Sequence, residues 1–183
     1  MTVRLTLLAA APGPAGRAVR FGDDGPLDER ALRRTREVVV PAAGLVYTAP
    51  SVRCRATAAA LGREGARVEE ALRDLDPGLW RGRTLDEVAA DDPAALAAWT
   101  TDPAAAPPGG EPVTALCARV ADWLDGLPGD AGRVLAVTGP AVVRAAVLHA
   151  VGAPPGAFWR IDVEPLSATG LSGRAGRWNL RLA

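Results

Sequence analysis

Two apolar runs of strand length constrain the fold of this chain most. Val3–Ala9 and Arg133–Thr138 consist almost entirely of hydrophobic residues, without the regular polar alternation of a half-exposed strand. Such runs are typical of strands in a parallel sheet that is covered by helices on both faces. With 183 residues the chain is long enough to enclose a hydrophobic core, and we expect one domain over residues 1–183.

Segments with helical signals alternate with these strands. Asp28 is well placed as the N-cap of one helix, and Pro50 is predicted at the first position of another. Helices are expected at 28–38, 50–61, 85–90, 93–99, 111–127 and 140–151, strands at 3–9, 44–47 and 133–138, an irregular segment at 68–80, and a hairpin at 167–182. This order predicts a three-layer α/β sandwich, with a mostly parallel central sheet flanked by helices and a C-terminal antiparallel hairpin.

The composition argues against several classes of function. The formal net charge is zero, so no overall field attracts nucleic acid or an anionic membrane. All 21 basic residues are arginines, which excludes a phosphate-binding loop with lysine and a Schiff-base lysine. With His149 as the single histidine, a histidine metal cluster is also excluded. We therefore expect no metal, no cofactor, and neither a nucleic-acid nor a membrane partner.

The cysteines and the N-terminal segment bear on localisation. Cys54 and Cys117 lack the spacing of a zinc site or a disulfide framework, and we expect reduced thiols. Arg4 and the following LTLLAAA resemble a very short signal peptide, but the apolar run is at the lower limit for one. We interpret it as a buried strand and expect a cytoplasmic protein. No segment approaches the ~20 apolar residues that span a membrane.

A series of short motifs lies between the two long strands. An Ala-Pro pair precedes a helix with an arginine in its first turn, an acidic residue precedes a Gly-x-Trp-x-Gly pattern, and a Gly-Glu pair precedes a further helix. These are Ala49-Pro50 with Arg53, Thr57 and Ala58; Asp74 with Gly78, Trp80 and Gly82; and Gly110-Glu111. In this order they resemble the histidine phosphatase superfamily, also called the phosphoglycerate mutase-like fold, over nearly the whole chain.

The resemblance fails at the two histidines that define this family. The family's first strand ends in Arg-His-Gly, and Ala9–Ala11 stand at those positions in this sequence. The second histidine position corresponds to Gly139. The resemblance implies that the first histidine would become phosphorylated and the second would hold the phosphoryl oxygens. Ala10 and Gly139 have no lone pair to offer, so the nucleophile position is predicted to be empty.

The resemblance also implies that part of an anion pocket remains. Arg53 matches the family's central phosphate-binding arginine, Arg20 a substrate-contacting arginine, and Asp74 the general acid. Arginine suits phosphate or carboxylate, and helix N-termini attract anions. Whether Arg17 or Arg144 enters the pocket stays open at this stage. The candidate ligand-binding residues are Arg53, Arg20, Asp74, Thr138, Gly139 and Trp80.

No other residue is a convincing replacement for the missing nucleophile. Cys54 lies beside Arg53 near a helix N-terminus, which can lower a thiol pKa, but no arginine follows it six residues later as in cysteine phosphatases. His149 follows Gly139 by ten residues on one helix, a distance of about 15 Å. We therefore expect His149 to be a packing or edge residue.

Three hypotheses about function follow. The first is a degenerate family member that transfers no phosphoryl group and binds an anionic, phosphate- or carboxylate-bearing small molecule or a protein partner. The second is a repurposed enzyme, with Asp74 as general acid or base and Arg53 as anion anchor, for elimination, isomerisation or cyclisation of a metabolite. The third is a structural or regulatory subunit, which an exposed apolar patch would favour.

Overall fold

The computed structural model describes residues 2–13, 19–174 and 176–182. Within them the strands form one sheet in the order β3-β2-β4-β1-β5-β6. The parallel strands are β1 (Val3–Ala9), β2 (Leu45–Thr48), β3 (Arg67–Val68) and β4 (Arg133–Thr138), while β5 (Ala168–Arg174) runs antiparallel to β1 and pairs with β6 (Arg177–Arg181). The predicted fold class, a mostly parallel sheet with a C-terminal antiparallel hairpin, is confirmed.

The register of β1 and β4 brings together Ala10 and Gly139, the positions at which the resemblance predicts the two missing histidines. Arg4 pairs with Arg133 at one end and Ala9 with Thr138 at the other. The ladder continues one step further, because the Ala10 amide donates to the Thr138 carbonyl over 2.8 Å. Ala10 and Gly139 therefore follow neighbouring strands at the same edge of the sheet.

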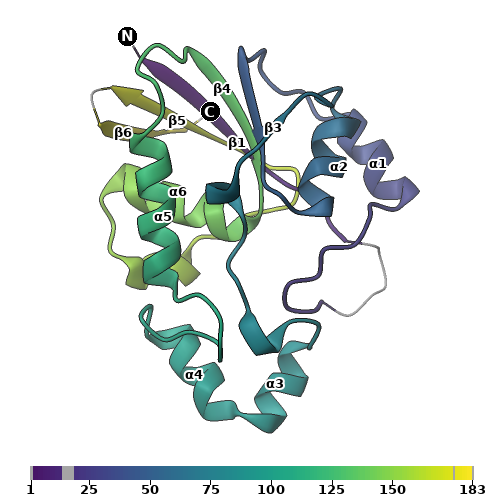
Figure 1. The fold of residues 1–183 in the computed structure, drawn as a ribbon, viewed down its shortest axis with the longest axis vertical. Coiled ribbons are helices and arrows are strands. Elements are labelled where there is room, and N and C mark those ends of the chain that lie inside the picture. The colour runs from purple at the N-terminus through teal and green to yellow at the C-terminus, as the bar shows by residue number, and fades with distance from the viewer. Residues whose placement is uncertain (1, 14–18, 175, 183) are drawn as a thin grey trace.

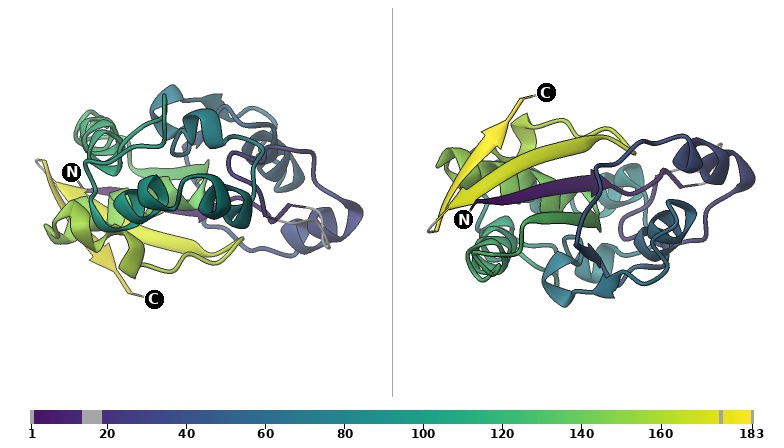
Figure 2. Two further views of the ribbon diagram at one scale, coloured as in Figure 1. Left: turned by 90° about the horizontal axis from the view of Figure 1, so that it is seen from below. Right: turned by 90° about the horizontal axis from the view of Figure 1, so that it is seen from above.

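Helices cover both faces of this sheet. α5 (Val113–Asp125) and α6 (Pro140–Val151) pack against each other, and α6 also contacts β1 and β6. α1 (Glu29–Arg36) and α2 (Val52–Ala60) form a second pair, and α2 contacts β2 and β4. In Figure 1 the two pairs lie on opposite sides of the strands, and Figure 2 shows the β5–β6 hairpin at the edge remote from α1 and α2.

A smaller unit of two helices lies beyond the carboxyl ends of the parallel strands. α3 (Leu85–Asp91) and α4 (Pro93–Thr101) stand at the bottom of Figure 1. Their own cluster of buried side chains contains Trp80, Val88 and Trp99. The rings of Trp80 and Trp99 meet edge to face with centroids 5.6 Å apart, an arrangement that aromatic pairs prefer.

Several predicted boundaries are corrected by the structure. Pro50 does not begin a helix: Ser51 is the N-cap of α2, because its side chain accepts a hydrogen bond from the Cys54 amide at 3.1 Å. The helix predicted from residue 111 begins at Val113, after Pro112 as its N-cap. The segment predicted as irregular contains β3 and two 3-10 turns, Glu70–Leu72 and Gly78–Trp80. The predicted cap of α1 is confirmed, since Asp28 accepts from the Ala31 amide at 2.7 Å.

Candidate functional site

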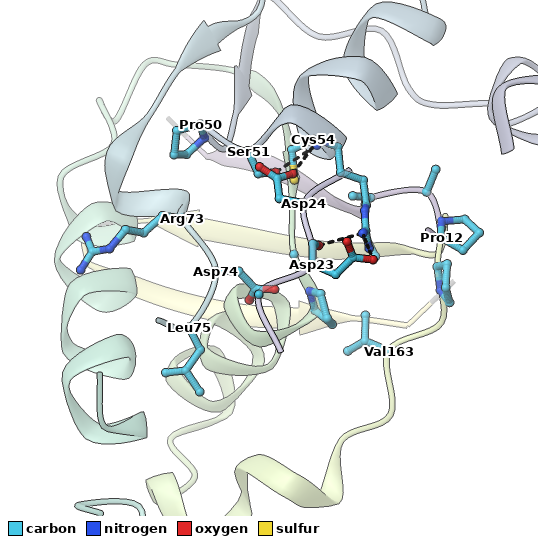
Figure 3. A pocket seen from close by; sticks show the side chains of 18 of the residues that line it. Pro12, Asp23, Asp24, Pro50, Ser51, Cys54, Arg73, Asp74, Leu75 and Val163 are labelled. Atoms are coloured by element: carbon cyan, nitrogen blue, oxygen red, sulfur yellow. Dashed lines mark hydrogen bonds and ion pairs between the residues drawn. The ribbon is translucent and has the colours of Figure 1, made fainter. Parts of the chain in front are cut away.

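A cavity of about 500 Å³ opens where the parallel strands β1 and β4 end (Figure 3). Such edges are where open α/β sheets place their ligand sites. Three candidates from the sequence, Arg53, Asp74 and Gly139, line it together with Ala10. The other lining residues are Ala9, Ala11, Pro12, Gly22, Asp23, Asp24, Pro50, Ser51, Cys54, Arg73, Leu75, Asp76, Arg81, Pro140, Val163 and Pro165.

The carboxylate of Asp74 occupies the space beside Gly139. A Cβ atom added to Gly139 would overlap the Asp74 carboxylate, so any side chain at position 139 would have to displace it. Asp74 Oδ1 accepts a hydrogen bond of 3.1 Å from the Ala141 amide. Because Gly139 is the N-cap of α6 and has no side chain, Asp74 takes over the capping of this helix.

The environment of Asp74 acts on its acidity in opposing ways. Burial raises the pKa of the Asp74 carboxyl. Hydrogen bonds from the Leu75 and Ala141 amides, and the charges of Arg144 and Arg119, act against this rise. By its accessible surface Asp74 is an exposed residue, and it lines the cavity.

A second carboxylate caps the helix that carries Arg53. Asp24 accepts hydrogen bonds from the Val52 amide at 2.8 Å and from the Arg53 amide at 2.9 Å. These amides belong to the first turn of α2, whose positive end points at the cavity. The N-terminus of α2 is thus already bound to an anionic group of the chain itself.

Arg53 lines the cavity as the sequence predicts, but it is already paired. Its Nη2 atom donates to the Asp23 carbonyl at 2.7 Å and to the Asp23 carboxylate at 3.1 Å. The Arg53 Nε atom is buried and has no hydrogen-bond partner among the described residues. In Figure 3 the Asp23, Asp24 and Asp74 side chains surround the same space.

The remaining charges of the cavity are paired as well. Arg81 contacts Asp76 at 2.7 Å, and Arg73, which extends away from the three carboxylates in Figure 3, contacts Glu111 at 3.3 Å. Among the residues that the structure describes, the cavity lining contains four aspartates and three arginines. Each of these three described arginines has an acidic partner, so with the four carboxylates ionised a dianion would meet more negative than positive charge from them.

Three of the sequence candidates lie outside the lining of this cavity. Arg20 is exposed and donates to Glu87 at 3.2 Å and to the Gly82 carbonyl at 2.7 Å. Thr138 is buried, and its hydroxyl donates to the Leu72 carbonyl at 2.8 Å. Trp80 is buried in the cluster beneath α3 and α4. Each of these residues is engaged in packing or hydrogen bonding elsewhere, and their expected ligand contacts stay predictions.

Cys54 and His149 do not supply a reactive nucleophile to the cavity. Burial raises the pKa of the Cys54 thiol to about 12, so this cysteine is not a thiolate at neutral pH. His149 lies 3.1 Å from the Asp125 carboxylate, away from the cavity. Arg144 Nε donates to the Ile161 carbonyl at 2.7 Å, and Arg144 is not a lining residue. Arg17 falls outside the described residues.

Neither a metal-binding cluster nor a helix that could span a membrane is present among the described residues. Histidine, cysteine, aspartate and glutamate side chains do not gather there into a group of three or more that could hold a metal ion. Over the same part of the chain, no helix has both the length and the apolar character to span a membrane.

Sequence reasoning missed the carboxylates of Asp23 and Asp24. Both lie in the DDGP stretch, whose residues predict a loop. Two adjacent acidic residues near a cavity that was expected to bind anions were the available signal. Their positions depend on hydrogen bonds with residues about thirty positions later in the chain. The Arg53 amide, for example, donates to the Asp24 carboxylate.

The chain belongs to the histidine phosphatase superfamily (branch 1), whose family model matches residues 15–183. No curated protein sequence shows significant similarity to it.

Solved structures with the same fold include two phosphatases. A mycobacterial glucosyl-3-phosphoglycerate phosphatase is 26% identical, with a TM-score of 0.79 over 98% of this chain and 97% of that one. Its complex with inorganic phosphate is similar at 27% identity and a TM-score of 0.79, over 98% and 95% of the two chains. An α-ribazole phosphatase from Shigella flexneri shares the fold at 19% identity, with a TM-score of 0.84 over 98% and 95%.

Proposed function

We propose that this protein transfers no phosphoryl groups and uses the cavity to bind a small molecule. The observation that carries the proposal is the Asp74 carboxylate, which fills the space that a side chain at Gly139 would need. On the neighbouring strand Ala10 supplies no nucleophile. Preorganised positive charge is the main contribution to stabilising a phosphoryl transition state, and here the chain's own carboxylates neutralise it.

The pairing in the cavity favours a monoanionic ligand, such as a carboxylate, over a phosphate. A ligand carboxylate can exchange with the Asp23 carboxylate on Arg53 without changing the charge of the contact. A phosphate ester would bring about two negative charges toward Asp24 and Asp74. The mycobacterial relative has been solved with inorganic phosphate, and we propose that this chain has lost that preference.

Hydrolysis and binding assays test the two parts of this proposal. With a panel of phosphate monoesters, we expect no turnover above background from the wild type or from Arg53→Ala. Turnover that disappears in Arg53→Ala would contradict the first part. With a panel of small carboxylates, we expect ligands that raise the melting temperature of the wild type but not of Arg53→Ala. A panel in which only phosphate esters stabilise the protein would contradict the second part.

A second candidate function rests on the raised pKa of Asp74 and its exposure to the cavity. A carboxyl whose pKa is shifted toward neutrality suits general acid or base catalysis. We propose, as the alternative, non-phosphatase chemistry with Asp74 as the acid or base and Arg53 as the anchor. Such an activity should disappear in Asp74→Asn, and an activity that survives in this variant would exclude Asp74 from the role.

A further inference from the structure

Three arginines line a second, smaller cleft at the opposite end of the sheet. The cleft measures about 220 Å³ and lies where β1 and β4 begin, near the end marked N in Figure 1. Its arginines are Arg4 of β1, Arg133 of β4 and Arg181 of β6, and all three are exposed. The rest of the lining is Thr6, Val134 and residues 41–43.

The strand register places these three arginines on one face of the sheet. Arg4 and Arg133 are direct partners across β1 and β4. Thr6 follows Arg4 by two residues on β1 and shares its face of the sheet. Gly170 of β5 pairs with Thr6 on one side and with Arg181 of β6 on the other. Since Gly170 has no side chain, and a Cβ there would already come to 3.5 Å from the Arg181 Cβ, the glycine leaves open space between Arg181 and β1.

The charges of this cleft are unbalanced. Among the described residues, none of the three guanidinium groups makes an ion pair or a side-chain hydrogen bond, and no acidic residue lines the cleft. Like charges directly opposite each other across two strands destabilise a sheet. An anion bound among the arginines would relieve this repulsion.

We propose that this cleft binds the diphosphate group of a small molecule. Guanidinium groups form paired hydrogen bonds with phosphate oxygens, and three of them match the charge of a diphosphate better than that of a single carboxylate. The small volume and the zero net charge of the chain favour a compact ligand group over a nucleic-acid backbone. The proposal involves different residues from the cavity and does not depend on the function proposed for it.

Calorimetric titration of the full chain with inorganic pyrophosphate tests the proposal. We expect binding of one pyrophosphate, weakened about tenfold or more in each of Arg4→Gln, Arg133→Gln and Arg181→Gln, and weakened by raised salt. Arg177→Gln is the matched control, because Arg177 is an exposed arginine on the same strand as Arg181 but does not line the cleft. Arg53→Gln is the control for the cavity. Both controls should bind like the wild type.

The variants also separate a binding site from a merely structural cluster. If the arginines repel one another, Arg133→Gln should be at least as stable as the wild type in the absence of ligand. Pyrophosphate should raise the melting temperature of the wild type and of the two control variants more than that of Arg133→Gln. The affinities for ADP and for adenosine, compared with that for pyrophosphate, then show whether the cleft binds a nucleotide or free diphosphate. No binding by the wild type, equal weakening in Arg177→Gln, or weakening in Arg53→Gln alone would each overturn the proposal.

Discussion

The two ends of the sheet differ in whether their positive groups are paired with carboxylates of the chain. At the carboxyl ends of β1 and β4, Asp24 and Asp74 cap two helices that point at the cavity, and Asp23 holds Arg53. At the opposite end, Arg4 and Arg133 face each other without a carboxylate partner among the described residues.

We infer from this difference that an arginine and helix N-termini do not by themselves make a site for a dianion such as phosphate. Arg53 and the N-termini of α2 and α6 lie at the cavity, and groups of this kind commonly bind phosphate in proteins. Its own aspartates are already bound to each of these parts. The arginine cleft has no helix N-terminus in its lining, yet its charge is uncompensated. On this account, an anion binds where arginines and helix N-termini are not already paired with the chain's own carboxylates.

The largest effect is expected from restoring a side chain next to Asp74. Gly139→His should lower the free energy of unfolding by about 2 kcal/mol, because the imidazole must overlap or expel the carboxylate that caps α6. Denaturant unfolding measures this, with Gly65→His as control, since Gly65 has open space around its Cβ position. In the double variant Gly139→His/Asp74→Ala, the loss of stability should be smaller than the sum of the losses in the two single variants. Equal losses in both glycine variants would show that Asp74 does not occupy this space.

A somewhat smaller effect is expected at the other capped helix. Asp24→Ala should cost about 1 kcal/mol of stability, because the Val52 and Arg53 amides lose their acceptor. Asp24→Asn keeps an acceptor oxygen and should retain most of the stability. Chemical denaturation of the three proteins measures the difference. If Asp24→Ala proved as stable as the wild type, the carboxylate would not be needed at this helix end.

The raised pKa of Asp74 predicts a pH effect of definite sign. The folded state binds the Asp74 proton more tightly than the unfolded chain, so this group lowers stability progressively as pH rises from about 4, the unfolded value, through its folded pKa. The stability of the wild type should therefore fall relative to Asp74→Asn as pH rises from about 4 to about 7. Unfolding curves across this range measure it. A difference that stays constant, or that grows in favour of the wild type, would contradict the assignment.

The smallest stability effect is expected at the Arg53 pair, although its effect on binding should be clear. The Arg53 and Asp23 side chains are 21% and 34% exposed, so Asp23→Ala should cost less than about 1 kcal/mol. It should, however, make the cavity attractive to anions by freeing Arg53. Asp76→Ala breaks the other ion pair between lining residues without freeing Arg53 and is the matched control. Phosphate titration compares the two variants. An equal gain of affinity in both would mean that the gain comes from the lost negative charge in general and not from freeing Arg53.

The sequence predicted the elements that carry strong local signals. Arg133–Thr138 and the helix after Gly139 were found from a continuous apolar run, a proline at the helix start and a glycine at its end. The family, too, was recognised from short motifs. β3, with only two residues, carries no such signal and exists through its pairing with β2.

The charge pairing at both ends of the sheet was beyond the reach of sequence reasoning. Arg4 and Arg133 meet only because β1 and β4 pair in one particular register. Asp74 and Gly139 are 65 positions apart, and nothing local indicates that the carboxylate of one fills the space beside the other. Such contacts depend on the tertiary fold, whereas patterns of apolar residues depend on nearby positions.

The most direct test of this account is a titration of the ¹⁵N-labelled protein with inorganic pyrophosphate, followed through its backbone amide resonances. We predict that the amides of Arg4, Arg133 and Gly170 shift at low ligand concentration, while those of Val52, Arg53 and Ala141 do not. Shifts of the cavity amides at concentrations that leave the arginine cleft unchanged would mean that the aspartates do not block the cavity, and would contradict the account.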